Sequence, residues 1–390
     1  MRIFDLWVKK VKDLALSRDR FTRIQMPGVE INPIAGLELK VLELTKGRKE
    51  KACVITTHSA FRAMLAGGAD LSHEYYAVVE ECSLEAVEEL WSGVQEVHPA
   101  ILIAAGGGKC LDTAKLLKQR TGLPLIAVPT SPATCSAFSP ISVVYSPEGE
   151  YKEVVDLDVT PDLVWLDWDL LLSSPSRMLR AGMGDALAKW LEAKAVLCGL
   201  PGQPGKDRGL GSKIQVECEA NGQAAFELAR ECALNIARFG EQAVADHESM
   251  ARSQAWQDML WSNVMTSGMA SYIGGADLPA AAAHTFANAL TAVPRAKTVL
   301  HGEAVALGSV VQALLLEGQG ADSSERLELV ALLRRLGLPC RLQETALGNL
   351  TPEETSVIVK KAFLANESME ALPFKVRQEE FQRAITDIGK

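Results

Sequence analysis

The chain has 390 residues, of which 48% are hydrophobic and 23% charged, as expected for a soluble globular protein large enough for two domains. Its net charge of −9 and pI near 5.4 argue against nucleic acid or an anionic membrane as the main partner. No apolar run approaches the about 20 residues of a membrane span. The eight cysteines form no C-x-x-C pair, which argues against a disulfide framework or cysteine zinc site and favours reduced thiols in the cytoplasm.

The first segment, residues 1–16, is predicted to be an extra N-terminal amphipathic helix. Charged residues occur along its whole length, and it lacks the continuous apolar stretch and small-residue cleavage site of a signal peptide. We expect it to pack on the body of the protein or on another subunit, with a membrane surface as the alternative.

Helices and strands then alternate up to about residue 128. Helices are predicted at 37–44, around 60–66, at 84–94 and from about 110 to 118, and strands at 52–56, 75–81, 100–105 and 124–128. Short apolar strands separated by helices indicate a parallel sheet with crossover connections. Ligands bind such sheets at the carboxyl ends of the strands, where residues 106–109 and 130–139 both fall.

After about residue 175 only helical periodicities remain. They cover 178–197, 215–245, 250–273, 279–291, 301–317, 324–336 and 353–364. The Pro/Gly-rich stretch 199–211 is interpreted as a surface excursion between helices. The chain is therefore predicted to contain an α/β domain (1–175) followed by an all-α domain (176–390).

A glycine-rich loop follows the third of these strands, in "AAGGGKCLDTAK" (104–115). It is not a P-loop, because Ile103 and Cys110 occupy positions that need glycine and Ser or Thr, and Leu111 breaks the G-x-G-x-x-G fingerprint. Gly106, Gly107 and Gly108 would still let a phosphate approach the backbone at a helix N-terminus. A tight strand-to-helix turn is the alternative.

The next candidate segment, "PTSPATCSAFSPISVVY" (129–145), is dense in hydroxyl groups and small residues. It is long enough to wrap a ribose and a nicotinamide ring, or it is a turn region that leads into an edge strand. Its position about one α/β unit after the glycine loop favours ligand binding.

Three residues from separate helical segments are candidate metal ligands. Asp185 lies in the first turn of a helix opened by "GMGDALAKWLEA" (182–193), His284 lies in an alanine run, and His301 starts another helix. Two histidines and a carboxylate suit a catalytic divalent metal with an open position. Alternatively, Asp185 complements the helix N-terminus and pairs with Lys189, and the histidines are ordinary helix residues.

Four segments in this order resemble the iron- or zinc-dependent alcohol dehydrogenase superfamily, most closely its glycerol dehydrogenase branch. They are "GGGKCLDTAK" (106–115), "GMGDALAKWLEA" (182–193), "AAAAHTFANAL" (280–290) and "LHGEAVALG" (300–308). The resemblance runs from about residue 20 to the C-terminus. It implies the dehydroquinate synthase-like/glycerol dehydrogenase-like fold, with an N-terminal dinucleotide-binding domain, a helical domain and the active site between them.

The resemblance also implies roles for individual residues. Asp185, His284 and His301 correspond to the metal ligands of the family, for one Zn²⁺ or Fe²⁺. Gly108 and Lys109 would contact the cofactor pyrophosphate. The residues on the nicotinamide side would be Thr130, Ser139, Ile141 and Tyr145.

Several positions depart from glycerol dehydrogenases. Cys135 replaces an aspartate that helps to hold the polyol, and Lys189 replaces an uncharged residue, so both resemble bacterial hydroxycarboxylate dehydrogenases. Thr57 replaces an acidic residue that holds the adenosine ribose in many NAD-using relatives, which admits NADP. Asn288 stands where relatives often carry a further histidine.

We therefore expect a metal-dependent NAD(P) oxidoreductase acting on small 2-oxo or 2-hydroxy acids with NADP(H). The alternative is an NAD-dependent glycerol or polyol dehydrogenase. A dehydroquinate-synthase-like lyase and a non-catalytic cofactor-binding protein are more remote alternatives. A small-molecule substrate and a homo-oligomer are expected, since many relatives form dimers to octamers.

Overall fold

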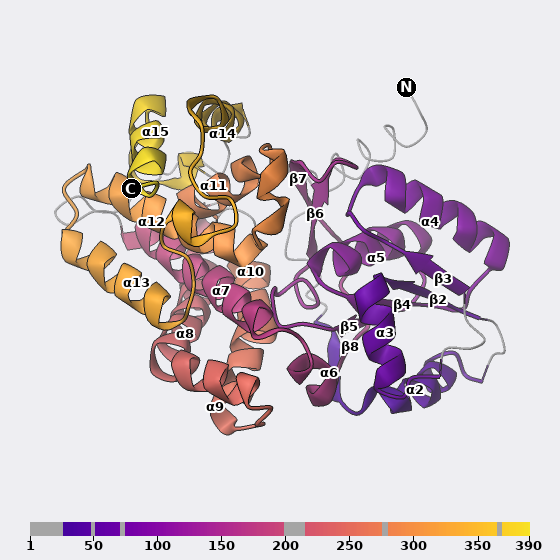
Figure 1. Cartoon of the computed structure of the whole chain (residues 1–390). Coiled ribbons are helices and arrows are strands. Elements are labelled where there is room, and N and C mark those ends of the chain that lie inside the picture. Colours follow the sequence, from indigo (N-terminus) through magenta and orange to yellow (C-terminus); the bar gives the residue numbers. More distant parts are fainter. Residues whose placement is uncertain (1–25, 48–50, 71–74, 199–214, 275–279, 365–368) are drawn as a thin grey trace.

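The computed structural model describes residues 26–47, 51–70, 75–198, 215–274, 280–364 and 369–390. The sheet and its helices occupy one half of the molecule and helices α7–α15 the other (Figure 1). The predicted helix 1–16 and the Pro/Gly-rich stretch 199–211 lie outside the described residues.

The first half is built on a six-stranded sheet of order β1-β8-β5-β4-β2-β3, in which every neighbouring pair is parallel. The strands are β1 (Gly28–Ile31), β2 (Ala52–Thr56), β3 (Tyr75–Val78), β4 (Ile101–Gly106), β5 (Leu125–Pro129) and β8 (Leu163–Leu166). The predicted parallel sheet is confirmed.

Helices cover both faces of this sheet, which explains why its central strands are apolar throughout. Val54 and Ile103 pack on one face with α2 (Leu37–Leu44) and α3 (His58–Ala66). Ile55 and Leu102 pack on the other with α4 (Leu84–Val97) and α5 (Gly108–Thr121), in a core that continues into the helical half.

The strand order reverses between β2 and β4. The connection from β2 leads outward to β3, whereas the connection from β4 leads the other way to β5. A crevice forms outside the carboxyl ends of parallel strands at such a reversal. Thr57 follows β2 at this edge, and Gly107 follows β4.

Some strands differ from the prediction. β3 ends at Val78 instead of continuing to 81, and neither the edge strand β1 nor its neighbour β8 was predicted. The end of the hydroxyl-rich segment is not an edge strand of the main sheet: β6 (Ile141–Tyr145) pairs antiparallel with β7 (Tyr151–Asp156) in a separate hairpin. Its alternating burial gives a weaker signal than the apolar runs of the main sheet.

The second half is helical, as predicted. Its helices are α7 (Ser176–Cys198), α8 (Gln215–Glu248), α9 (Gln254–Leu260), α10 (Ser267–Gly274), α11 (Ala282–Leu290), α12 (His301–Glu317), α13 (Ser323–Arg335), α14 (Pro352–Leu364) and α15 (Gln378–Asp387). The short helix α6 (Trp168–Leu172) precedes them and follows β8. The predicted single helix 250–273 is instead α9 and α10 joined by a π-helical turn, Trp261–Thr266. Within the described residues, no helix combines the length and apolar character needed to cross a membrane.

Candidate active site

Glycines let helices α7 and α12 approach closely beside Asp185 and His301. A Cβ built on Gly302 would lie 1.7 Å from the carbonyl oxygen of Ala181, and one on Gly184 would lie 2.4 Å from the carbonyl oxygen of Gly302. Any larger residue at either position would push the two helices apart. The glycines next to Asp185 and His301 thus bring these side chains together.

The third ligand helix, α11, packs on α12 in the same way. A Cβ on Gly308 would lie 2.2 Å from the carbonyl oxygen of Ala283, the residue before His284. The small residues beside His284 and His301 therefore serve close helix packing.

Asp185, His284 and His301 form one cluster, in which one potential ligand atom from each residue lies within 4.8 Å of the others. Asp185 Oδ1 lies 3.2 Å from His284 Nε2 and 3.7 Å from His301 Nε2. One carboxylate oxygen and two imidazole nitrogens fit a divalent cation with room for a further ligand. The structure thus brings the three predicted residues together.

Asp185 does not lie in the first turn of its helix, because α7 begins at Ser176. The helix N-terminus is therefore not its partner. Its Oδ2 accepts a hydrogen bond from Lys189 Nζ at 2.9 Å, and both side chains are buried. Burial alone would raise the pKa of Asp185, but Lys189 and the two histidines outweigh it and keep the carboxyl ionised.

The two histidines differ in their surroundings. Burial lowers the pKa of His284, but Glu192 and Asp185 on either side of the ring raise it to about 10. Burial lowers the pKa of His301 to about 4. Glu192 Oε2 lies 2.5 Å from His284 Nδ1. This contact was not predicted from the sequence. The i, i+4 and i+7 spacing of Asp185, Lys189 and Glu192 could have indicated that Glu192 lies on the same helix face as Asp185.

The glycine loop lies at the strand reversal. α5 begins at Gly108, so its first turn faces this edge of the sheet. A Cβ on Gly106 would meet Cys110 at 2.7 Å and one on Gly108 would meet Thr134 at 3.2 Å, whereas the space beside Gly107 is open. Gly106 is thus needed for packing, Gly108 lies in a tight contact with the Thr134 side chain, and Gly107 leaves the loop accessible.

Lys109 is engaged by a carboxylate. Its Nζ lies 2.6 Å from Glu81 Oε2 and 5.1 Å above the centre of the Tyr145 ring. The side chain remains 45% exposed, so its ammonium group is still accessible from solvent. An anion at this loop would compete with Glu81 for Lys109.

The hydroxyl-rich segment is fastened to α5 by the buried pair Asp112 and Lys115. Lys115 Nζ lies 2.9 Å from Asp112 Oδ1, donates to the carbonyl of Ser139 at 3.0 Å and also bonds the carbonyl of Ile141. Asp112 accepts the N–H of Val143 at 3.0 Å. The pair therefore steadies this segment.

The remaining predicted residues lie around the same edge. Thr57 caps the N-terminus of α3 by accepting the N–H of Ala60 at 3.2 Å. The N–H of Thr130 donates to the carbonyl of Gly106 at 3.2 Å, which joins the ends of β4 and β5. Cys135 is buried against Gly268 of α10.

The two halves meet beside these residues. Asn263, in the π-helical turn, donates to the carbonyls of Pro132 and Leu179 at 3.2 and 3.1 Å. A Cβ on Gly182 would lie 2.0 Å from the same Pro132 carbonyl. The end of the sheet half thus contacts α7 one turn before Asp185, so the nucleotide candidates and the metal candidates face a common junction.

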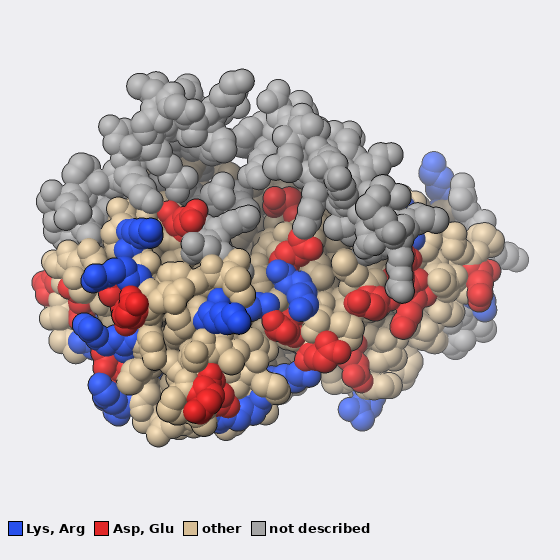
Figure 2. Space-filling model, turned by 90° about the horizontal axis from the view of Figure 1, so that it is seen from above, with Lys and Arg blue, Asp and Glu red and all other residues tan. Residues whose placement is uncertain are grey.

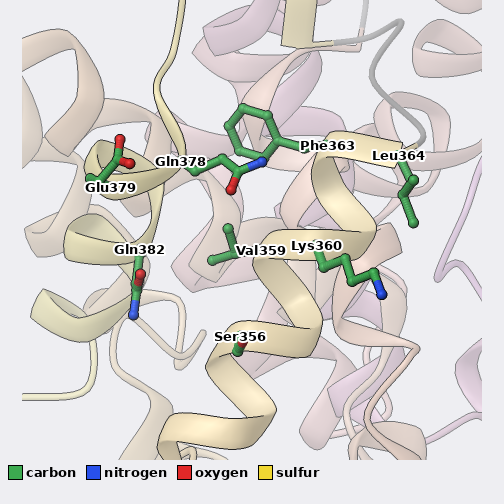
Figure 3. A pocket seen from close by; sticks show the side chains of 8 residues that line it. All are labelled: Ser356, Val359, Lys360, Phe363, Leu364, Gln378, Glu379 and Gln382. Atoms are coloured by element: carbon green, nitrogen blue, oxygen red, sulfur yellow. The ribbon is translucent and has the colours of Figure 1, made fainter.

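Two other surfaces formed by described residues contribute no candidate residues. A groove between α14 and α15, shown in Figure 3, is lined by side chains such as Val359, Phe363 and Gln378, and by none of the ligands or loop residues above. On the face drawn in Figure 2, basic and acidic side chains are interspersed, and the described part of that face has no continuous basic surface.

Comparison with known proteins places this arrangement in a family. Residues 36–168 match the iron-containing alcohol dehydrogenase family, and residues 282–360 match the 3-dehydroquinate synthase C-terminal family. Glycerol dehydrogenase from Thermotoga maritima is 34% identical over 75% of each chain. Hydroxycarboxylate dehydrogenase A from Escherichia coli is 32% identical over 74% of this chain and 75% of that protein.

The fold agrees over nearly the whole length. The crystal structure of a probable glycerol dehydrogenase from Sinorhizobium meliloti has a TM-score of 0.78 and 25% identity, and the match covers 94% of this chain and 98% of the other. The predicted resemblance and fold class are confirmed. The chain belongs to the iron-containing alcohol dehydrogenase superfamily, in its glycerol dehydrogenase-like branch.

Proposed function

We propose that this oxidoreductase transfers hydride reversibly between NADP(H) and small 2-oxo or 2-hydroxy acids, with a divalent metal at Asp185, His284 and His301. The cluster of these three side chains is the observation that carries the proposal. A metal there would act as a Lewis acid on the substrate oxygen. The proposal includes a division into a nucleotide-binding domain (1–175) and a catalytic domain (176–390), with the site between them.

The protein side chains prepare this site. Lys189 keeps Asp185 ionised and in place through the 2.9 Å hydrogen bond. The Asp112–Lys115 pair holds Ser139 and Ile141, on the proposed nicotinamide side, against α5. The crevice between β2 and β4 would take the rest of the cofactor, with its pyrophosphate at Gly108.

The preference for acids rests on Cys135. A carboxylate at this buried position, where glycerol dehydrogenases typically have aspartate, would repel an anionic substrate, and a cysteine does not. Lys189 adds a positive charge nearby, although its direct partner is Asp185. The similarity to hydroxycarboxylate dehydrogenase A supports the same class.

The proposed preference for NADP over NAD rests on Thr57. This side chain provides an uncharged cap at the end of β2, 3.8 Å from a Cβ built on Gly106, so no acidic group at that position repels a 2′-phosphate. The second candidate function is NAD-dependent oxidation of glycerol or another polyol. It is favoured by the similarity to glycerol dehydrogenases in sequence and structure.

A substrate panel tests the proposal. Purified protein supplied with Zn²⁺ or Fe²⁺ is assayed with 2-oxo acids and NAD(P)H, and with polyols and NAD(P)⁺. We expect the highest kcat/KM for a 2-oxo acid with NADPH. Glycerol oxidation with NAD⁺ far above all 2-oxo acid reduction would overturn the substrate proposal, and turnover unaffected by Asp185→Ala would overturn the metal proposal.

A further inference from the structure

Glu192 is buried beside the metal candidates and uses both carboxylate oxygens. It lies on α7, with no exposed surface. Its Oε1 accepts the backbone N–H groups of Ala281 at 2.7 Å and His284 at 2.9 Å, and its Oε2 lies 2.5 Å from His284 Nδ1. One side chain therefore contacts both the first turn of α11 and the ring of a candidate ligand.

The first turn of α11 depends on this contact. Its N-cap residue, Ala281, has no side-chain oxygen with which to accept the free N–H groups of the helix. Glu192 supplies such an oxygen from α7, and Gln312 of α12 supplies another by accepting the N–H of Ala282 at 3.1 Å. The Glu192 carboxylate thus helps to set the position of α11 and, through it, of His284.

The contact to the ring has a second consequence. His284 Nε2 is the nitrogen that faces Asp185 Oδ1, at 3.2 Å. A neutral imidazole that offers a lone pair at Nε2 must carry its proton on Nδ1. Glu192 Oε2 is placed to accept that proton's hydrogen bond. We propose that Glu192 is a positioning residue that holds His284 with Nε2 free for the metal, an inference that rests on the metal site of the proposed function.

The other histidine helix is fastened to α7 differently. Glu303 accepts the N–H of Leu300 at 2.9 Å and forms a bidentate pair with Arg177 of α7, both at 2.6 Å. Its hydrogen bonds go to the helix N-terminus and to Arg177, and not to His301. Glu303→Gln is therefore a matched control: it also removes one charge from a buried carboxylate that docks a histidine helix on α7.

Glu192→Gln separates the two roles of Glu192. The amide oxygen can still accept the N–H groups of Ala281 and His284, which leaves the amide NH₂ facing His284 Nδ1. That NH₂ opposes a proton on Nδ1 and favours the tautomer protonated at Nε2. If the amide were flipped, its NH₂ group would face the N–H groups of Ala281 and His284, and both of those hydrogen bonds would be lost. The variant should keep the helix docked but disfavour the metal-binding form of the ring.

The test compares full-length wild type, Glu192→Gln and Glu303→Gln. The Zn²⁺ dissociation constant of each is measured by competition with a chromophoric chelator, and the stability of each is measured by thermal unfolding without metal. We expect Glu192→Gln to bind Zn²⁺ about 10–100-fold more weakly. Glu303→Gln should change Zn²⁺ affinity by less than about threefold while losing stability. Equal affinity of wild type and Glu192→Gln, or equal loss in both variants, would overturn the inference.

A measurement on wild type covers the case in which the variant does not fold. Long-range ¹H–¹⁵N spectra of Zn²⁺-loaded protein labelled at histidine should show His284 protonated at Nδ1 and coordinated through Nε2. Coordination through Nδ1 would overturn the inference. The proposed metal site itself would be overturned if wild type did not bind Zn²⁺, or if Asp185→Ala bound Zn²⁺ as tightly as wild type.

Discussion

The two halves of the molecule build their candidate sites in opposite ways. At the edge of the sheet, the glycine loop offers backbone N–H groups and open space beside Gly107. Between the helices, Asp185, Lys189 and Glu192 are buried charges whose partners come from packed elements. The first site depends on strand topology and tolerates change at its accessible surface. The second depends on helix spacing and tolerates little.

The largest expected effect comes from glycines. Gly302→Ala places a Cβ 1.7 Å from the Ala181 carbonyl and forces α7 and α12 apart, so we expect a loss of more than about 4 kcal/mol or failure to fold. Gly107→Ala adds its Cβ to open space and should change stability by less than about 1 kcal/mol. Denaturant unfolding measures both, and similar losses would contradict the contrast.

The buried lysines give the next comparison. Lys189→Met and Lys115→Met each leave a buried aspartate without its cation, at a cost of about 3–5 kcal/mol in the metal-free protein. Zn²⁺ should restore part of the lost stability of Lys189→Met, because the metal replaces the charge beside Asp185, but not of Lys115→Met. Melting temperatures with and without Zn²⁺ check this, and equal responses would contradict the placement of the metal.

Thr57→Asp addresses the sheet edge alone. Aspartate can still cap α3, so folding should be unchanged, while its charge repels a 2′-phosphate and can bind ribose hydroxyls. We expect the NADP-to-NAD ratio of kcat/KM to fall by about 10–100-fold, or 1.4–2.8 kcal/mol. Zn²⁺ affinity is the control, since Thr57 contacts none of the ligands. An unchanged ratio would argue against a ribose role for this position.

The smallest effect concerns one buried thiol in each half. Burial raises the pKa of Cys53 in β2 and of Cys232 in α8 from 9.0 to about 12. Both thiols then hold their protons more tightly in the folded state, so stability is retained below about pH 9 and falls as pH rises towards 12. We expect a loss of about 1 kcal/mol per thiol by pH 10. Replacing either cysteine by alanine should flatten that slope, and an unaltered slope would refute the assignment.

Local sequence sufficed for much of the sheet half. The apolar runs of β2, β4 and β5 have nearly the predicted bounds, because strands buried on both faces must be apolar at every position. The same logic fails for β1, whose end residues are exposed, and for the half-buried hairpin β6–β7. The glycine loop was found from its composition, but its position at the strand reversal depends on the order of β2 and β4 in the sheet.

In the helical half, the sequence by itself determined which segments are helical and which three side chains have the chemistry of metal ligands. The tertiary structure decided that they meet, because Asp185 and His301 are 116 residues apart and only the close packing of α7, α11 and α12 joins them. It also decided the partners of Lys189 and Glu192. Helical spacing places both residues near Asp185. A buried charge, however, must form hydrogen bonds with the groups that pack against it, and for Glu192 these groups belong to α11, which is distant in the chain.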